Sequence, residues 1–164
     1  AFGVKVIAFD PYLQRPAEKI ELTDFETVLR KSDFISIHCP LNESTRHLIG
    51  GQEFKKMERK PLLINTSRGP IVNEKALIQA LEEGHISGAG LDVLETEPPD
   101  SRNHMLKMEN VLLSPHVGFY SEESISELKR RAAKNVSDVL RGRWPGSVVN
   151  REVMGKTRAT ISID

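Results

Sequence analysis

The sequence lacks several features that mark specialised classes of protein. Among its 164 residues there is one cysteine, Cys39, which excludes an internal disulfide and is typical of a reducing compartment. Lysine plus arginine equal aspartate plus glutamate at 23 each, so the chain has no basic excess of the kind that nucleic-acid binders carry. No apolar run approaches the roughly 20 residues that span a bilayer, and no secretory signal is visible at the start. We therefore expect a cytoplasmic protein that binds neither nucleic acid nor membranes directly.

What the sequence does contain is a regular alternation of strand-like and helix-like segments. Runs of β-branched and apolar residues predict strands at 4–9, 34–38, 62–64, 86–91 and 111–113. Apolar residues at helical spacing predict helices that begin near 24, 51, 74 and 122, with Asn73 and Ser121 as N-caps of the last two. The tail from 144 to 164 has no clear period. The alternation predicts an α/β fold with a parallel sheet.

Asp10 comes directly after the first predicted strand. An acidic residue at the end of the second strand of a dinucleotide-binding sheet accepts hydrogen bonds from the ribose hydroxyls of NAD and repels the extra phosphate of NADP. Before Pro11, however, an aspartate can equally be a simple turn residue. The matching G-x-G-x-x-G loop would lie about 20 residues upstream, but only nine residues precede Asp10 and the chain does not begin with methionine. We therefore expect a fragment that starts inside the helix after that loop.

Polar residues follow the next strands at the points where they end. Arg68 follows the strand at 62–64, Asp92 and Glu97 follow the strand at 86–91, and His116 follows the strand at 111–113. Ligands of parallel α/β sheets sit outside the carboxyl ends of the strands. Taken singly, these residues could be a surface arginine, an exposed acidic turn and a structural histidine. His38 and Cys39 are adjacent, which is poor metal-ligand spacing, so no metal site is expected.

Taken together, the polar residues suit the reduction of a 2-oxo acid by NADH. The planar fork of Arg68 can fix the substrate carboxylate and polarise its carbonyl. His116, as an imidazolium, can donate the proton to the carbonyl oxygen, and Glu97 would favour the protonated ring. The loop from 39 to 45 is expected to lie along the cofactor.

Three stretches of the sequence resemble the signature blocks of the D-isomer-specific 2-hydroxyacid dehydrogenases. They are Asn-Thr-Ser-Arg-Gly at 65–69 with Val-Asn-Glu-Lys-Ala-Leu at 72–77, Gly-Leu-Asp-Val-Leu-Glu-Thr-Glu-Pro at 90–98, and Ser-Pro-His-Val-Gly at 114–118. The resemblance runs from Val4 to about Asn150. It implies that Arg68 binds substrate, that His116 is the acid/base, and that Glu97 rather than Glu95 pairs with His116.

The same resemblance implies a set of residues that line NAD. Asp10 would hold the adenosine ribose and Asp92 the nicotinamide carboxamide. The full set expected at the cofactor is Asp10, Cys39, Pro40, Asn42, Thr45, Thr66, Ser67, Arg68, Asp92, His116 and Gly118. Two departures from the family pattern stand out. Asn73 replaces the more usual aspartate, which is harmless because both cap helices, and the glycine-rich loop is absent.

The family fold implied is a Rossmann-type doubly wound parallel sheet, here truncated at the N-terminus so that the glycine-rich loop and first strand are absent. Residues 1–143 would be most of the NAD-binding domain, and 144–164 a tail returning towards the missing substrate domain. In the usual strand order 3-2-1-4-5-6 the missing strand is central. The strands at 4–9 and 62–64 would then flank a gap, the fragment alone would be inactive, and the intact protein would be a homodimer.

A second function class resembles part of the chain. Phe-Tyr-Ser-Glu-Glu-Ser at 119–124, with the long basic helix after it, is similar to the C-terminal-binding proteins, transcriptional corepressors that share this dehydrogenase fold. In that class NAD(H) binding promotes dimerisation and partner binding. The sequence also leaves the substrate open among glyoxylate, hydroxypyruvate, phosphohydroxypyruvate and longer 2-oxo acids, because the family selects substrates largely through the other domain.

Overall fold

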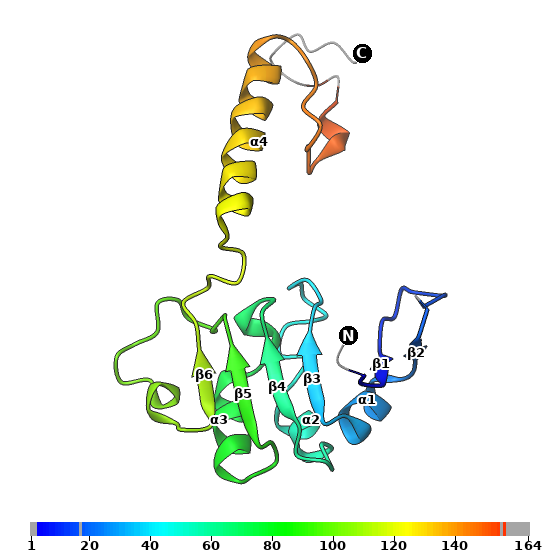
Figure 1. Ribbon diagram of the computed structural model, residues 1–164, viewed down its shortest axis with the longest axis vertical. Helices are drawn as coiled ribbons and strands as arrows, with labels where there is room; N and C mark the ends of the chain where they lie inside the picture. The colour runs from blue at the N-terminus through cyan, green and yellow to red at the C-terminus, as the bar shows by residue number, and fades with distance from the viewer. Residues whose placement is uncertain (1–2, 17, 155, 157–164) are drawn as a thin grey trace. The chain divides into compact units, whose positions relative to one another are not determined.

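The computed structural model describes residues 3–16, 18–154 and 156, and it divides into two compact units. The first unit runs to Gly118 and the second begins at Phe119. The elements of the first unit are β1 (Val6–Ala8), β2 (Ile20–Leu22), α1 (Phe25–Lys31), β3 (Phe34–Ile37), α2 (Gly51–Lys55), β4 (Leu62–Asn65), η1 (Gly69–Ile71), α3 (Glu74–Glu82), β5 (Gly88–Leu91), η2 (His104–Lys107) and β6 (Val111–Leu113). Figure 1 shows this alternation of strands and helices.

Every strand pairing in the first unit is parallel. Strands β3, β4, β5 and β6 form one sheet in that order, and β1 and β2 form a separate pair. Each parallel connection needs a crossover; α2, α3 and η2 lie in the connections of the four-stranded sheet. The predicted α/β fold with a parallel sheet is confirmed.

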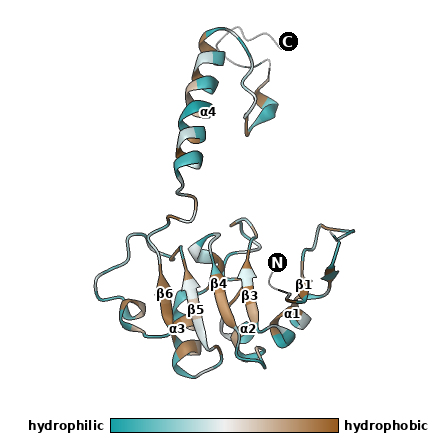
Figure 2. Ribbon diagram, viewed as in Figure 1, coloured by the Kyte–Doolittle hydropathy of each residue, from teal (hydrophilic) through white to brown (hydrophobic). Residues whose placement is uncertain are grey.

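One face of the four-stranded sheet carries the core. Successive strand residues point to opposite faces, and the buried face packs with α2 and α3 in one apolar cluster. Its members include Leu29, Ile35, Phe54, Leu63, Leu77 and Ile86. On the other face Phe34, Leu62 and Leu112 are 61%, 39% and 77% exposed. The strands β3, β4 and β6 are correspondingly apolar in Figure 2, whereas β5 is pale because it consists mostly of glycine and alanine.

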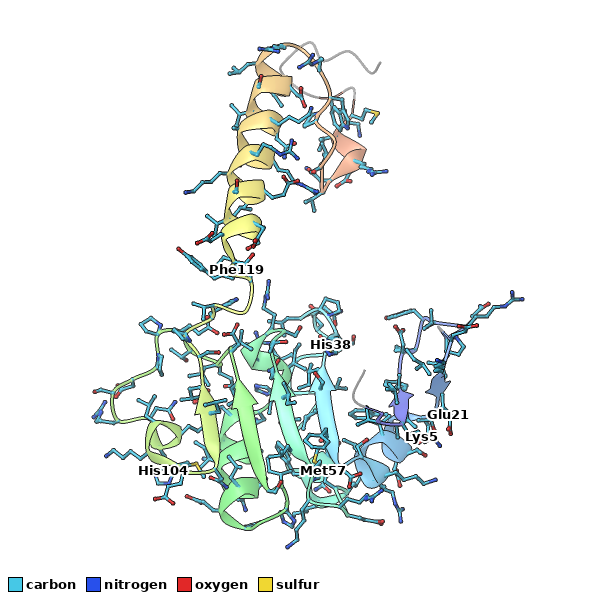
Figure 3. All side chains as sticks on the ribbon, in the orientation of Figure 1. Lys5, Glu21, His38, Met57, His104 and Phe119 are labelled. Carbon is cyan, nitrogen blue, oxygen red and sulfur yellow. The ribbon has the colours of Figure 1, made fainter. Side chains whose placement is uncertain are left out.

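Strand β2 was not predicted from the sequence, and it corrects the expected strand order. It is a run of three residues, Ile-Glu-Leu, too short to show an alternating pattern, and it forms only by pairing with β1. An ion pair of 2.7 Å between Lys5 Nζ and Glu21 Oε2 joins these two segments (Figure 3). The strand beside β1 is therefore β2, and the strand at Phe34, β3, pairs with β4 instead.

The predicted gap beside the strand at Leu62 is wrong. Strand β4 is paired on both sides, with β3 through Phe34↔Leu62 and with β5 through Leu62↔Gly88. The edge strands of the four-stranded sheet are therefore β3 and β6. Among the described residues, the break in pairing falls between β1 and β3.

The second unit consists of α4 (Glu122–Leu140) and η3 (Arg151–Val153). Ser121 caps α4 as predicted, because its hydroxyl accepts the N–H of Ser124 at 3.1 Å while the Ser124 hydroxyl accepts the N–H of Ser121. Near the other end Lys134 and Arg143 both bind the buried carboxylate of Asp138. Within the described ranges, no helix combines the length and apolar character needed to cross a bilayer.

Candidate functional site

The carboxyl ends of β4, β5 and β6 bring three polar loops to one edge of the sheet. The Asp92 N–H donates to the Asn65 carbonyl at 3.0 Å, and the Ser114 N–H donates to the Leu91 carbonyl at 3.0 Å. These bonds extend the parallel ladders to the last strand residues. The loops that carry Arg68, Glu97 and His116 therefore leave the sheet side by side.

His116 and Glu97 form a direct pair. His116 Nδ1 lies 2.7 Å from Glu97 Oε2, and Glu97 Oε1 accepts the N–H of Leu94 at 2.9 Å. Burial raises the pKa of Glu97, but the hydrogen bonds from His116 and from Leu94 lower it by more, so its pKa lies below the ordinary glutamate value. Near neutral pH Glu97 is thus a carboxylate that only accepts, which places a proton on His116 Nδ1.

Asp92 holds the turn that carries His116. It is 6% exposed, its Oδ1 accepts the Ser114 hydroxyl at 2.5 Å and the Val117 N–H at 2.9 Å, and its Oδ2 accepts the Gly118 N–H at 2.9 Å. Burial raises the pKa of Asp92, but these three hydrogen bonds outweigh burial and keep the pKa below the ordinary aspartate value. A carboxylate has about four acceptor positions, so Asp92 can still accept one further donor.

The contribution of Asp92 to stability should depend on pH. Because its pKa is lower in the folded state, its stabilisation is complete above the unfolded value of about 3.9 and is lost as the pH falls through the folded value. We expect Asp92→Asn to lower the free energy of unfolding by about 1–3 kcal/mol at pH 7. Urea unfolding from pH 7 to pH 3 should show the difference from wild type shrinking on the acid side. Asp33→Asn, at an exposed ion pair, is the control; an Asp92 effect independent of pH would contradict this role.

A tight turn built by Asn65 and Gly69 positions Arg68. Asn65 is 1% exposed, and its side chain donates to the Arg68 carbonyl and accepts the Ser67 N–H, both at 3.0 Å. A Cβ on Gly69 would lie 1.9 Å from the Leu94 carbonyl oxygen, so only glycine allows the two backbones to touch here. The Arg68 loop is therefore in backbone contact with the loop that carries Glu97, while the Arg68 side chain is exposed.

The loop from 39 to 45, which the sequence predicts to line the cofactor, lies against the β4 exit. The Ser67 hydroxyl donates to the Cys39 carbonyl at 2.6 Å, and the Thr45 hydroxyl donates to the Pro40 carbonyl at 2.6 Å. Asn42 Oδ1 accepts the N–H of Thr45 at 3.1 Å, which closes the loop. Burial raises the pKa of Cys39, which keeps it a neutral thiol.

The two remaining predicted site residues, Asp10 and Thr66, are both exposed. Asp10 is exposed at the end of β1, where its carboxylate accepts the Tyr12 N–H at 2.9 Å. Thr66 is exposed in the turn after β4. His38, labelled in Figure 3, lies past the end of β3 within 2.8 Å of the Ser36 hydroxyl. Over the described ranges, no three His, Cys, Asp or Glu side chains gather as metal ligands.

A second group of polar side chains at this edge was not predicted. Glu95, Glu74, His47 and Asn103 come from four separate segments and are joined by hydrogen bonds. The sequence signal was the pair of glutamates at 95 and 97, of which only the second had an expected role. The partners of Glu95 are 21 and 48 residues away in the sequence, so no local pattern identifies them.

Comparison with known proteins places this arrangement in context. Residues 1–118 match the model of the D-isomer-specific 2-hydroxyacid dehydrogenase NAD-binding domain. The chain is 42% identical over 156 residues to a glyoxylate reductase of Korarchaeum cryptofilum, which covers 93% of the chain and 47% of that protein. It is 44% identical over 156 residues to a glyoxylate reductase of Thermococcus litoralis, again over 93% of the chain and 47% of the relative.

A solved structure agrees with these sequence relatives. The NAD-complexed D-isomer-specific 2-hydroxyacid dehydrogenase of Lactobacillus delbrueckii ssp. bulgaricus superimposes with a TM-score of 0.81 at 38% identity, covering 90% of this chain and 49% of that one. The chain therefore spans about half the length of the curated relatives it matches.

Proposed function

Because the chain belongs to the D-isomer-specific 2-hydroxyacid dehydrogenases, we propose that it supplies the acid–base and cofactor-binding part of an enzyme that reduces a 2-oxo acid to a D-2-hydroxy acid. The observation that carries the proposal is the 2.7 Å contact between His116 Nδ1 and Glu97 Oε2 at the sheet edge where the Arg68 loop also ends. A histidine oriented by a carboxylate is the usual arrangement of a side chain that transfers protons.

Each of the three residues has a separate task in this proposal. His116 donates a proton from Nε2 to the carbonyl oxygen, while Glu97 holds Nδ1 and stabilises the charged ring. Arg68 binds the substrate carboxylate through its planar guanidinium and places positive charge near the carbonyl oxygen. Asp92 holds the 114–118 turn, so that His116 keeps its orientation when it loses the proton.

The residues predicted to bind NAD have chemistry that suits the cofactor. Asp10 is an exposed carboxylate past the end of β1, suited to ribose hydroxyls, and Asp92 keeps one acceptor position for an amide N–H. Gly118 leaves room beside Asp92, because a Cβ there would lie 2.9 Å from Asp92 Oδ2. Cys39, Pro40, Asn42, Thr45, Thr66 and Ser67 would line the same side. NADH supplies the hydride when it is bound.

The proposal is tested by measuring NADH oxidation by the intact protein over a panel that includes glyoxylate, hydroxypyruvate and phosphohydroxypyruvate. We expect turnover of at least one acid, and we expect Arg68→Ala to lower kcat/KM for that acid by roughly 100-fold while NADH binding is retained. The control is Arg59→Ala, which removes an arginine from an exposed ion pair with Asp33. NADH binding without turnover of any acid would contradict the enzyme and favour the corepressor-like NAD(H) sensor.

We further propose that the intact protein is a cytoplasmic homodimer, as the family resemblance implies. Apolar side chains on α4 that are exposed in this chain support it, since a homodimer interface needs apolar area. They include Leu128, Val136 and Leu140, which are 59%, 59% and 82% exposed.

A further inference from the structure

Glu95 is held on both its backbone and its side chain by the first residue of α3. The Glu74 N–H donates to Glu95 Oε1 and the Glu95 N–H donates to Glu74 Oε2, each at 3.1 Å. This reciprocal pair satisfies one of the free N–H groups at the start of α3 and places a carboxylate near the positive end of the helix. Glu95 is thereby attached to α3, a helix that is itself part of the apolar core.

Two further side chains complete the group. His47 Nε2 lies 2.7 Å from Glu95 Oε1, the same oxygen that accepts the Glu74 N–H. The Asn103 amide donates to Glu74 Oε1 at 2.7 Å, from the segment just before η2. The backbone N–H of His47 in turn donates to the Pro70 carbonyl at 2.8 Å, which links this group of side chains to the segment after Arg68. We name Glu74, His47, Glu95 and Asn103 the Glu95 cluster.

Within the Glu95 cluster, Glu95 itself lies two residues before Glu97, whose carboxylate pairs with His116. Leu94, the neighbour of Glu95 on the other side, touches Gly69 through its carbonyl and donates its N–H to Glu97 Oε1. Only Thr96 therefore separates the anchored backbone of Glu95 from Glu97. A shift of Glu95 must therefore move both the backbone of Glu97 and the Leu94 N–H, which orients the Glu97 carboxylate.

We propose that Glu95 is a positioning residue for the acid–base pair: held by Glu74 and His47, it fixes the loop that keeps the Glu97 carboxylate against His116. The catalytic consequence rests on the proposed function above, whereas the effect on the Glu97–His116 contact does not. Other histidine–glutamate pairs of the first unit lack this linkage. His85–Glu83 joins residues two apart and His104–Glu82 joins α3 to η2, and neither reaches the 94–97 loop.

The test compares three variants of the intact protein. Glu95→Ala removes both bonds to Glu95 Oε1, Glu95→Gln keeps an oxygen that can accept both, and Glu83→Ala removes a histidine–glutamate pair elsewhere in the same unit. The first readout is the pKa of Glu97. It is measured by NMR, from the pH dependence of the carboxyl-carbon signal in protein labelled at its glutamate carboxyl groups. The Glu97 signal is assigned as the one that is missing in Glu97→Gln. The second readout is the split between kcat and KM for the acid that is turned over.

We expect Glu95→Ala to raise the pKa of Glu97 towards the ordinary glutamate value, because the bonds from His116 and Leu94 loosen. It should lower kcat roughly tenfold with little change in KM, since misplacement of a catalytic group acts on the chemical step. In Glu95→Gln both the pKa of Glu97 and kcat should stay close to their wild-type values. Glu83→Ala should change neither the pKa of Glu97 nor kcat.

The proposal is overturned if Glu95→Ala leaves the Glu97 titration as it is in Glu83→Ala. If Glu95→Ala does not fold, His47→Ala carries the same comparison, since it removes one bond to Glu95 from an exposed loop. If wild type turns over no 2-oxo acid and the Glu97 titration still responds to Glu95→Ala, the dehydrogenase proposal fails and the positioning role stands.

Discussion

Replacing His116 with alanine in the intact protein is expected to lower kcat for 2-oxo acid reduction by about 10²–10⁴-fold while NADH binding is retained. His116 is the group that Glu97 orients through Nδ1, and the 114–118 turn that carries it is fastened by Asp92. The variant leaves the Glu97 carboxylate without its histidine but keeps the sheet edge. Stopped-flow turnover and NADH fluorescence titration measure the two quantities separately.

The matched control is His104→Ala, which removes a histidine paired with Glu82 on the surface of the same unit. That variant should keep the wild-type kcat, since the His104–Glu82 pair does not reach the 94–97 loop and an exposed ion pair contributes only about 0–1 kcal/mol to stability. If imidazole added to the assay restores part of the rate of His116→Ala, that rescue would support proton transfer by His116. Equal kcat values for His116→Ala and wild type would remove His116 from the reaction.

Gly69→Ala is expected to destabilise the first unit more than the same change at any other glycine that the structure describes there. Its Cβ would lie 1.9 Å from the Leu94 carbonyl oxygen and 2.6 Å from the Glu95 nitrogen, so backbone rather than a flexible side chain must move. Overpacking of this kind costs about 1–3 kcal/mol and more when the backbone cannot yield; we expect about 3 kcal/mol. Urea unfolding of the intact protein measures the loss.

Gly90→Ala on β5 is the control for this prediction, because nothing lies within 4 Å of the position its Cβ would take. It should change stability by well under 1 kcal/mol, whereas Gly69→Ala should also reduce turnover by displacing the Glu95–Glu97 loop. Similar unfolding midpoints for the two variants would mean that the 69–71 turn and the 94–97 loop can separate without loss.

Much of the site could be predicted from the sequence because its signals are local. An apolar run followed by a polar loop identifies a strand and its exit, and parallel strands send those exits to one edge. The strand at 111–113 and the caps Asn73 and Ser121 follow from such patterns, whereas the pairing of Glu97 with His116 is what the family resemblance implied. The roles of the individual residues in binding NAD and substrate stay predictions.

Other features depend on which segments meet in space, and no local pattern encodes them. Three residues, Ile20–Leu22, form a strand by pairing with β1, whereas β3 pairs with β4. The bonds of Glu95 to Glu74 and His47 likewise join residues far apart in the chain. The sequence by itself thus determined the parallel α/β class and the strand exits that carry Arg68, Glu97 and His116, since periodicity and turn chemistry are properties of neighbours. Only the tertiary structure decided the strand order and the anchoring of the Glu97 loop, since long-range pairing depends on the competition among all the edges and donors that the fold brings together.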